Sequence, residues 1–238
     1  MKKLCILKLG STYETLKIQS GDFEDWIVSV LDIPRDEIEI VDPGSGVPID
    51  IEKYGGFIST GSHSMLSEEG EYAEYLSGIV SRILDFNIPY FGICYGHQLL
   101  AKAAGCQIGF NPNGLEAGIV DIITTPEAKK DNLFGLLPGV FQAFAIHSQT
   151  ILNPSSKIMR LAYNEFENHH AIRVGENAWG VQFHPEFTPF IMGEYLRQEN
   201  APAKLSQIYE NNSTEISSLT LKIFVKNIIK PYNLSKIH

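Results

Sequence analysis

The sequence predicts an α/β protein built on an open, mostly parallel sheet that helices cover on both faces. Short apolar runs alternate with longer amphipathic segments through the first hundred residues, which is the pattern of strands that alternate with helices. The run Tyr90–Ile93 is apolar without alternation, as is typical of a central parallel strand buried on both faces. Between residues 118 and 181 the sequence becomes richer in β-type segments separated by turns. We expect those strands to pair locally, in antiparallel fashion at one edge.

Along the first half of the chain the apolar pattern predicts strands at residues 4–9, 38–41, 56–59 and 90–93, and helices at residues 23–31, 71–86 and 98–104. In the helix over residues 71–86 the side chains at helical spacing form one apolar face; they are Tyr72, Tyr75, Leu76, Ile79, Val80 and Ile83. Asn87 and Pro89 end this helix, and Gly105 is expected to cap the next one.

The second half is expected to hold strands at residues 118–124, 140–147, 171–174 and 179–183, followed by a C-terminal helix at residues 214–229. Residues 197–238 differ in charge: they carry six basic and three acidic side chains, whereas residues 1–196 have a net charge of −12. We therefore expect one large domain over residues 1–196 and a C-terminal helical extension over residues 197–238. The extension is expected to pack on the domain or on a partner.

Composition and charge exclude several classes of protein. Of the 238 residues, 28 are acidic and 19 basic, so the net charge is −9 and a nucleic-acid partner is not expected. Three cysteines, Cys5, Cys94 and Cys106, cannot form a disulfide framework and favour a reducing compartment. The N-terminal apolar run is shorter than that of a signal peptide, and no segment approaches the length of a membrane-spanning helix. We expect a cytoplasmic protein without membrane contact.

The most informative segment is Gly-Ile-Cys-Tyr-Gly at residues 92–96, between a predicted buried strand and a predicted helix. A G-x-C-x-G sequence in this context predicts a nucleophile elbow, because a Cβ at residue 92 or 96 would clash in so sharp a turn. The turn places Cys94 at the N-terminus of the helix, where the helix dipole favours the reactive thiolate. Taken alone, the segment also fits a buried structural cysteine between two packing glycines.

A thiolate nucleophile needs a group that manages its proton, and His184 is the best candidate. It ends the strand predicted at residues 179–183 and is followed by Pro185, which favours an extended conformation at His184. Glu186 can lie on the same side and accept a hydrogen bond from the imidazole nitrogen that does not face Cys94. Cys94, His184 and Glu186 therefore form a candidate catalytic triad.

Two of these segments resemble the signature segments of class I glutamine amidotransferase domains: Gly-Ile-Cys-Tyr-Gly-His-Gln-Leu-Leu at residues 92–100 and Gly-Val-Gln-Phe-His-Pro-Glu at residues 180–186. The resemblance extends over residues 4–196 and is greatest to stand-alone proteins similar to the amidotransferase domain of GMP synthetase, a group that includes γ-glutamyl peptidases. It implies a flavodoxin-like sheet with the site at the carboxyl ends of the strands.

The same resemblance implies a role for each site residue. Cys94 would attack the γ-amide of glutamine, His184 would transfer protons, and Glu186 would orient His184. The resulting γ-glutamyl thioester would be hydrolysed by water. The backbone N–H groups of Tyr95 and Gly61 would form the oxyanion hole, although the family's two glycines followed by proline are replaced here by Thr60, Gly61 and Ser62.

Other residues that match family positions are expected to contact the substrate. Gln98 matches a glutamine that contacts the bound γ-glutamyl group. His147, Ser148 and Gln149 stand where the family has His-Gly-Asp, whose backbone lies along the substrate. The loss of that aspartate removes a carboxylate that could bind a substrate ammonium, so the sequence leaves the amide donor open.

Neither a metal nor a cofactor is expected. His63, His97, His147, His169 and His170 show no metal-ligand spacing with a third ligand, and the adjacent His169 and His170 would point apart in a strand. The segment Glu116-Ala117-Gly118 fits a family Glu-x-Gly pattern near the site and is interpreted as structural.

Three functional hypotheses remain. The first is a glutaminase that releases ammonia, and the second is a γ-glutamyl peptidase with the same chemistry at Cys94. The third is a subunit or binding module that is silent until a partner, such as an ammonia-accepting synthetase, docks, because the sequence contains no G-x-x-x-x-G-K phosphate loop. A homodimer is also compatible with the sequence.

Overall fold

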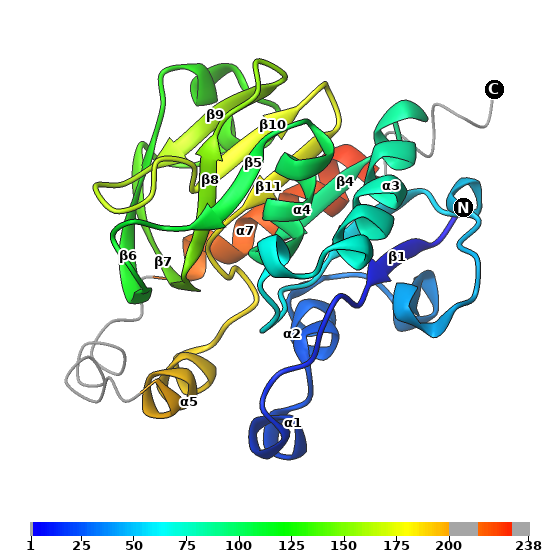
Figure 1. Ribbon diagram of the computed structural model, residues 1–238, viewed down its shortest axis with the longest axis horizontal. Helices are drawn as coiled ribbons and strands as arrows, with labels where there is room; N and C mark the ends of the chain where they lie inside the picture. Colours follow the sequence, from blue (N-terminus) through cyan, green and yellow to red (C-terminus); the bar gives the residue numbers. More distant parts are fainter. Residues whose placement is uncertain (1, 200–213, 230–238) are drawn as a thin grey trace.

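The computed structural model describes residues 2–199 and 214–229, and its strands and helices are arranged around one central sheet (Figure 1). The strands are β1 (Leu4–Leu7), β2 (Ile38–Val41), β3 (Gly56–Ser59), β4 (Tyr90–Ile93), β5 (Gln107–Phe110), β6 (Glu116–Thr124), β7 (Val140–His147), β8 (Gln149–Asn153), β9 (Ile158–Tyr163), β10 (Ala171–Val174) and β11 (Ala178–Val181). The α-helices are α1 (Glu14–Ser20), α2 (Phe23–Val30), α3 (Glu71–Asp85), α4 (Tyr95–Ala103), α5 (Pro189–Gln198) and α7 (Glu215–Ile223), and α7 continues as a π-helical turn over Phe224–Ile229.

The central sheet has the strand order β2-β1-β3-β4-β11-β10-β9-β6-β7. Its first five strands are parallel, in the order that defines flavodoxin-like folds. The remaining four strands pair in antiparallel fashion along one side. Both the parallel α/β sheet and the antiparallel edge are as predicted. A separate antiparallel pair, β5 and β8, lies beside this sheet.

Most predicted elements form, with shifted ends. The first strand stops at Leu7, two residues early, and the helix predicted to begin at residue 98 begins at Tyr95. Elements that were not predicted are α1, α5, β5, β8 and β9. Helix α1 has only seven residues and buries one of them, Leu16, so it shows little apolar periodicity. A single residue separates β8 from β7, too short a gap to carry a turn signal.

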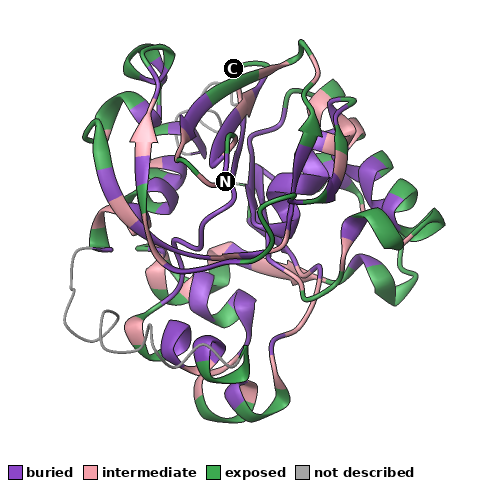
Figure 2. Cartoon of the chain, turned by 60° about the vertical axis from the view of Figure 1, so that its left-hand side comes forward, coloured by how far each residue is buried: buried purple, intermediate pink, exposed green. Residues whose placement is uncertain are grey.

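Alternate residues of the parallel strands enter two hydrophobic cores on opposite faces of the sheet. Leu4 and Ile6 of β1 pack with α2 and α7, whereas Cys5 and Leu7 pack with α3 and α4. Figure 1 shows α3 and α4 in front of the sheet and α7 behind it, and Figure 2 shows buried residues in the interior and exposed ones mostly on the outer helices and loops. The strands β1, β3, β4 and β11 are buried along their whole length. The sheet is therefore covered on both faces, as its uniformly apolar strands require.

Helix α7 and its π-helical continuation form part of the core behind the sheet. Phe224 is fully buried, and its ring lies 5.3 Å from that of Phe91 and 6.2 Å from that of Trp179. The absence of a side chain at Gly56 of β3 leaves room for this segment, because a Cβ at residue 56 would lie 2.7 Å from Ile229 Cδ1. The predicted C-terminal helix thus packs on the sheet of its own chain. The boundary at residue 197 stays a prediction, since residues 200–213 lie outside the described residues.

A third hydrophobic cluster lies where α1, α2 and α5 meet. Its central side chains are Phe23 and Trp26 of α2, Phe187 before α5, and Tyr195 of α5. The ring of Phe187 lies 5.5 Å from that of Trp26 and 5.0 Å from that of Tyr195. This cluster joins the N-terminal and C-terminal ends of the domain next to the site described below.

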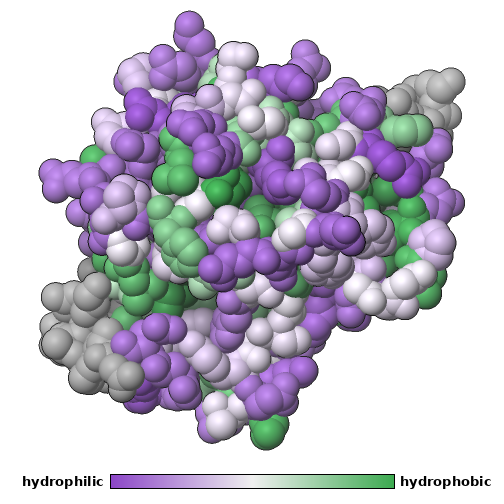
Figure 3. Space-filling view, viewed as in Figure 1, coloured by the Kyte–Doolittle hydropathy of each residue, from purple (hydrophilic) through white to green (hydrophobic). Residues whose placement is uncertain are grey.

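The surface in the view of Figure 3 mixes hydrophilic residues with smaller apolar patches. Among the residues that the structure describes, no helix is both long and apolar enough to cross a membrane. All three cysteines are buried as free thiols.

Candidate active site

Cys94 occupies the sharp turn between β4 and α4. Its backbone has φ 49° and ψ −98°, an unusual conformation for a residue other than glycine, and it directly precedes the first helical residue, Tyr95. The Cys94 N–H donates to Val181 O at 2.8 Å, which ties the turn to the neighbouring strand β11. Strained backbone of this kind persists only where the surroundings hold it, and it is concentrated at functional sites.

Two glycines make this turn possible, as the sequence predicts. A Cβ on Gly92 would lie 2.3 Å from Gly96 O, and a Cβ on Gly96 would lie 2.2 Å from Ser59 Oγ. Real Cβ atoms do not approach other atoms so closely, so alanine at either position would displace the backbone. The G-x-C-x-G pattern therefore reflects a steric requirement of the elbow.

His184 and Glu186 follow β11 and lie together as predicted. His184 Nδ1 lies 2.8 Å from Glu186 Oε1, and both side chains are buried. The His184 N–H donates to Phe144 O at 2.7 Å, and the imidazole stacks on Phe187 with ring centroids 4.0 Å apart. These contacts fix the orientation of the ring. Its other nitrogen, Nε2, is then the one that can hydrogen bond with Cys94.

The electrostatic environment favours a protonated His184. Burial by itself lowers the pKa of His184, but the charges of Glu186 and Cys94 and hydrogen bonds with both outweigh burial and raise the pKa to about 10. A protonated imidazole at this position can hydrogen bond with both the Glu186 carboxylate and the Cys94 sulfur. The Cys94 side chain is only 7% exposed and reaches solvent through a pocket.

The two residues expected to form the oxyanion hole both lie beside this group. Tyr95 is the first residue of α4, so its N–H is one of those left free at the helix N-terminus. Gly61 follows β3, and a Cβ there would lie 3.1 Å from His184 Cε1. The structure thus brings Gly61 against the His184 ring, although the family's Gly-Gly-Pro sequence is altered in this turn.

The predicted substrate-binding residues lie together, and their polar groups form hydrogen bonds with one another and with neighbouring residues. Gln98 Nε2 donates to Gln149 O at 3.2 Å and to Gln182 Oε1 at 3.1 Å. The Gln149 side chain donates to Ser67 Oγ at 2.6 Å and accepts from Ser67 N at 3.3 Å, and Ser148 Oγ lies 3.6 Å from Met65 Sδ. The Gln149 side chain therefore does not replace the aspartate carboxylate as a free substrate-binding group. It forms hydrogen bonds with Ser67 in the loop at residues 65–67.

His147 is engaged on both ring nitrogens. Nδ1 donates to Gln149 O at 3.1 Å, and Nε2 lies 2.8 Å from Glu116 Oε2. His170 Nε2 approaches the same carboxylate oxygen at 3.1 Å. Burial alone raises the pKa of Glu116, but the hydrogen bonds and charges of the two histidines hold that pKa well below its usual range. Glu116, interpreted from sequence as structural, is thus joined to the turn at residues 147–149.

A pocket with a volume of about 340 Å³ opens above Cys94. Part of its lining is predictable from sequence, namely Cys94, Tyr95, Gln98, His147, Ser148, Gln149 and His184. The other lining residues were not among the predicted site residues; they are Tyr13, Phe23, Ser62, His63, Ser64, Met65, Leu115, Ile146, Tyr195 and Glu199. Neither spacing nor a motif identifies Tyr13, Tyr195 and Glu199, because these residues reach the pocket through contacts between the two ends of the domain.

One wall of the pocket consists of tyrosine and histidine side chains that form hydrogen bonds. Tyr195 OH lies 2.9 Å from His63 Nε2 and 2.9 Å from Thr12 Oγ1, while Tyr13 OH donates to a Glu199 oxygen at 3.0 Å. Burial lowers the pKa of His63, although the charge of Glu199 opposes that shift. Lysine and arginine do not occur among the described residues that line the pocket.

The family model "Glutamine amidotransferase class-I" matches residues 35–201 of this chain. γ-Glutamyl peptidase 4 of Arabidopsis thaliana is 27% identical over 226 residues, which cover 93% of this chain and 88% of that protein. A glutamine-hydrolysing GMP synthase subunit of Natronomonas pharaonis is 33% identical over 112 residues, covering 47% of this chain and 59% of that protein.

Solved structures share the fold. A glutamine amidotransferase from Thermotoga maritima superposes with a TM-score of 0.74 at 19% sequence identity, covering 97% of this chain and 99% of that one. At this level of identity the similarity establishes the common architecture, which extends over nearly the whole of both chains.

Proposed function

Because this chain belongs to the class-I glutamine amidotransferase family, we propose that it is a cysteine-dependent hydrolase of γ-glutamyl amides that acts on γ-glutamyl peptides. The observation that carries the proposal is the buried His184–Glu186 pair, which raises the pKa of His184 beside a cysteine at the floor of an open pocket. This arrangement has the parts that acyl transfer through a thioester requires: an activated nucleophile, a proton donor and an orienting carboxylate.

In the first half of the reaction, the Cys94 thiolate attacks the γ-carbonyl carbon of the substrate. The developing oxyanion is stabilised by the backbone N–H groups of Tyr95 and Gly61. The His184 imidazolium then donates its proton to the departing amine, the C–N bond breaks, and a γ-glutamyl thioester remains on Cys94.

The second half of the reaction uses the same histidine as a base. The thiolate charge of Cys94 is one of the charges that raise the pKa of His184, and formation of the thioester removes that charge. The pKa of His184 therefore falls in the acyl-enzyme, so the ring can take a proton from the attacking water. Hydrolysis releases glutamate and restores the thiolate–imidazolium pair.

The extent of the pocket supports peptides as substrates. Besides Cys94, its lining includes Ile146, Tyr13, Met65 and Leu115, which gives apolar and aromatic surface for a leaving group larger than ammonia. The similarity to γ-glutamyl peptidase 4 spans 88% of that protein, which is consistent with the same domain organisation.

A second candidate is glutamine hydrolysis that supplies ammonia to a synthetase. The specific observation in its favour is the similarity to the GMP synthase subunit of Natronomonas pharaonis, which is glutamine-hydrolysing by its name. Both candidates use the same chemistry at Cys94 and differ in the leaving group.

Substrate profiling of the purified chain separates the two candidates. We expect kcat/KM for γ-glutamyl dipeptides to exceed that for glutamine by about 10-fold or more, since a side chain bound in an apolar pocket contributes about 1–3 kcal/mol. Amino-acid release and ammonia release are measured in parallel, with Cys94→Ala as the blank. Faster turnover of glutamine than of every dipeptide would reject the peptidase and leave the glutaminase.

The role of Glu186 predicts a change in pH dependence. In Glu186→Gln the carboxylate that raises the pKa of His184 is gone while the burial that lowers it remains, so that pKa falls. We expect the alkaline limb of the kcat/KM profile to move from near pH 10 to lower pH, and kcat/KM to fall about 10²- to 10⁴-fold. The measurement is a pH–rate profile from about pH 5 to about pH 10.5 for both proteins.

The same shift has a consequence for stability, which serves as a second readout. The folded-state pKa of His184 lies above the ordinary value of 6.5, so protonation of this ring stabilises the fold fully below pH 6.5 and ceases to do so as pH rises through about 10. Glu186→Gln should weaken this loss of stability between pH 6.5 and 10. An unchanged alkaline limb in the variant would show that Glu186 does not control the protonation of His184.

A further inference from the structure

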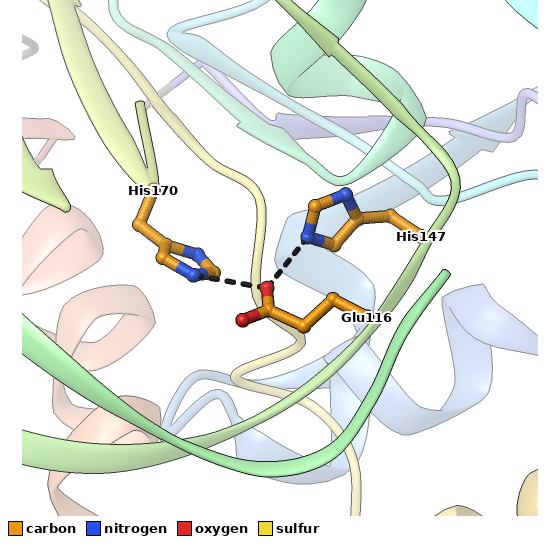
Figure 4. Close-up of side chains that lie close together, drawn as sticks. All are labelled: Glu116, His147 and His170. Carbon is orange, nitrogen blue, oxygen red and sulfur yellow. Dashed lines mark hydrogen bonds and ion pairs between the residues drawn. The ribbon is translucent and has the colours of Figure 1, made fainter. Parts of the chain in front are cut away.

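Three buried side chains from separate parts of the sequence converge next to the turn at residues 147–149 (Figure 4). Glu116 begins β6, His147 ends β7, and His170 directly precedes β10. The Glu116 Oε2 atom lies 2.8 Å from His147 Nε2 and 3.1 Å from His170 Nε2. One donor atom from each residue lies within 4.8 Å of the other two. The two imidazoles are 1% and 0% exposed, so this group is closed to bulk water.

The hydrogen bond of His147 Nδ1 directs its Nε2 toward Glu116. Its Nδ1 faces the backbone oxygen of Gln149, which can only accept, so Nδ1 carries a hydrogen. In a neutral ring the lone pair is then on Nε2, and Nε2 faces a carboxylate oxygen, which is also an acceptor. A metal ion between Nε2 and Oε2 would use the lone pairs of both atoms.

His170 brings a second imidazole to the cluster. Its Nε2 lies 3.1 Å from the same oxygen, and its Nδ1 has no hydrogen-bond partner among residues 2–199 and 214–229. A metal ion would use the lone pairs of both imidazoles and the carboxylate together.

We propose that Glu116, His147 and His170 bind a divalent metal ion, and that Zn²⁺ is the ion they fit. Two imidazole nitrogens and one carboxylate oxygen are an established zinc ligand set, and three protein ligands leave the fourth tetrahedral position for a small ligand such as water. Zinc bonds of about 2.0–2.2 Å place tetrahedral ligand atoms about 3.3 Å apart. The distances of 2.8 and 3.1 Å reach that value when the side chains separate by a few tenths of an ångström.

Two of the ligands also have the outer hydrogen bonds typical of metal sites. The Nδ1–H of His147 is oriented by the Gln149 carbonyl, and Glu116 Oε1 accepts from Asn164 Nδ2 at 2.8 Å. The closed surroundings favour zinc over an iron site of the two-histidine, one-carboxylate type, because such iron keeps several open positions for substrate. Spacing along the chain hides this group, since the two histidines are separated in sequence and the third ligand, Glu116, comes from another strand.

The site would be structural and adjacent to the reaction. A bound ion joins the start of β6, the end of β7 and the segment before β10, and it fixes the ring whose Nδ1 holds the Gln149 carbonyl. That carbonyl also accepts from Gln98, so the ion would stabilise the wall of the pocket without touching the substrate.

The test measures metal content. The purified protein is stripped with a chelator, incubated with Zn²⁺, freed of excess metal, and analysed by elemental mass spectrometry. We expect one zinc per chain for the wild type and less than about 0.1 per chain for His170→Gln, which removes a ligand but keeps a polar amide. The matched control is His169→Gln, because His169 is the adjacent histidine and lies outside the cluster; it should retain one zinc per chain. Co²⁺ in place of Zn²⁺ should give the visible absorption of a tetrahedral site in the wild type and in His169→Gln.

Cys94→Ala separates this proposal from the proposed function. That variant should lose hydrolysis and still bind one zinc, which places the metal outside the Cys94–His184 pair. Thermal unfolding of His170→Gln in chelator, compared with that of chelated wild type, shows whether the variant is folded. Absence of zinc in the reconstituted wild type, or one zinc per chain in a folded His170→Gln, would overturn the proposal.

Discussion

Replacing Cys94 with alanine should lower kcat/KM for γ-glutamyl substrates by about 10⁴- to 10⁶-fold, because no other group can form the thioester. The side chain is buried at the elbow and its removal changes little volume, so the fold should persist. Steady-state hydrolysis of a γ-glutamyl dipeptide and of glutamine, with far-ultraviolet circular dichroism as the check of folding, measures this effect.

Cys106→Ala is the matched control. Cys106 is also a buried free thiol, but it follows α4 and accepts a hydrogen bond from Ser155 N, away from the pocket lining. This variant should keep kcat/KM within about threefold of the wild type. A glutamine-mimicking electrophile should label the wild type and Cys106→Ala once and Cys94→Ala not at all. Equal hydrolysis by Cys94→Ala and wild type would reject a thioester mechanism.

The second large effect is expected at the C-terminal helix. Phe224→Ala should lower the free energy of unfolding by about 3–5 kcal/mol, because it removes a fully buried ring from contact with Phe91 and Trp179. Urea unfolding followed by circular dichroism gives the free energy and its dependence on denaturant.

Leu219→Ala is the control from the same helix. Leu219 is 41% exposed, so its truncation should cost less than about 1 kcal/mol. Similar small losses of unfolding free energy in both variants would mean that the helix does not pack on the sheet in solution. Other residues would then cover that face of the sheet.

The sheet was predictable from sequence because its signal is local. Uniformly apolar runs such as Tyr90–Ile93 and the helical spacing over residues 71–86 reflect burial that a window of about ten to fifteen residues records. The elements that were not predicted have weaker local signals. The two buried residues of β9, Leu161 and Ala162, are adjacent in sequence, and β5 has only one buried residue, Gly109, so neither strand shows a clean period of two.

The centre of the site was predictable for a different reason. The glycines around Cys94 and the proline after His184 constrain the backbone locally, and the sequence displays those constraints directly. The predicted partners His184 and Glu186 are only two residues apart, so their contact needs no knowledge of the fold. The remaining pocket wall depends on tertiary contacts between distant segments. No local sequence pattern identifies Tyr195 and Glu199 as lining residues, because their place in the wall depends on their contacts with Thr12 and Tyr13.

That wall also has a consequence for how the protein is made. Thr12 meets Tyr195 across 183 positions of sequence, and Tyr13 meets Glu199 across 186. A nascent chain can build the parallel strands β1 to β4 early, but these two contacts must wait until Glu199 has left the ribosome. Closing such distant contacts is slow compared with forming local ones. The protein should therefore complete this pocket at the end of synthesis, so partly made chains would carry Cys94 without the finished cavity beside it.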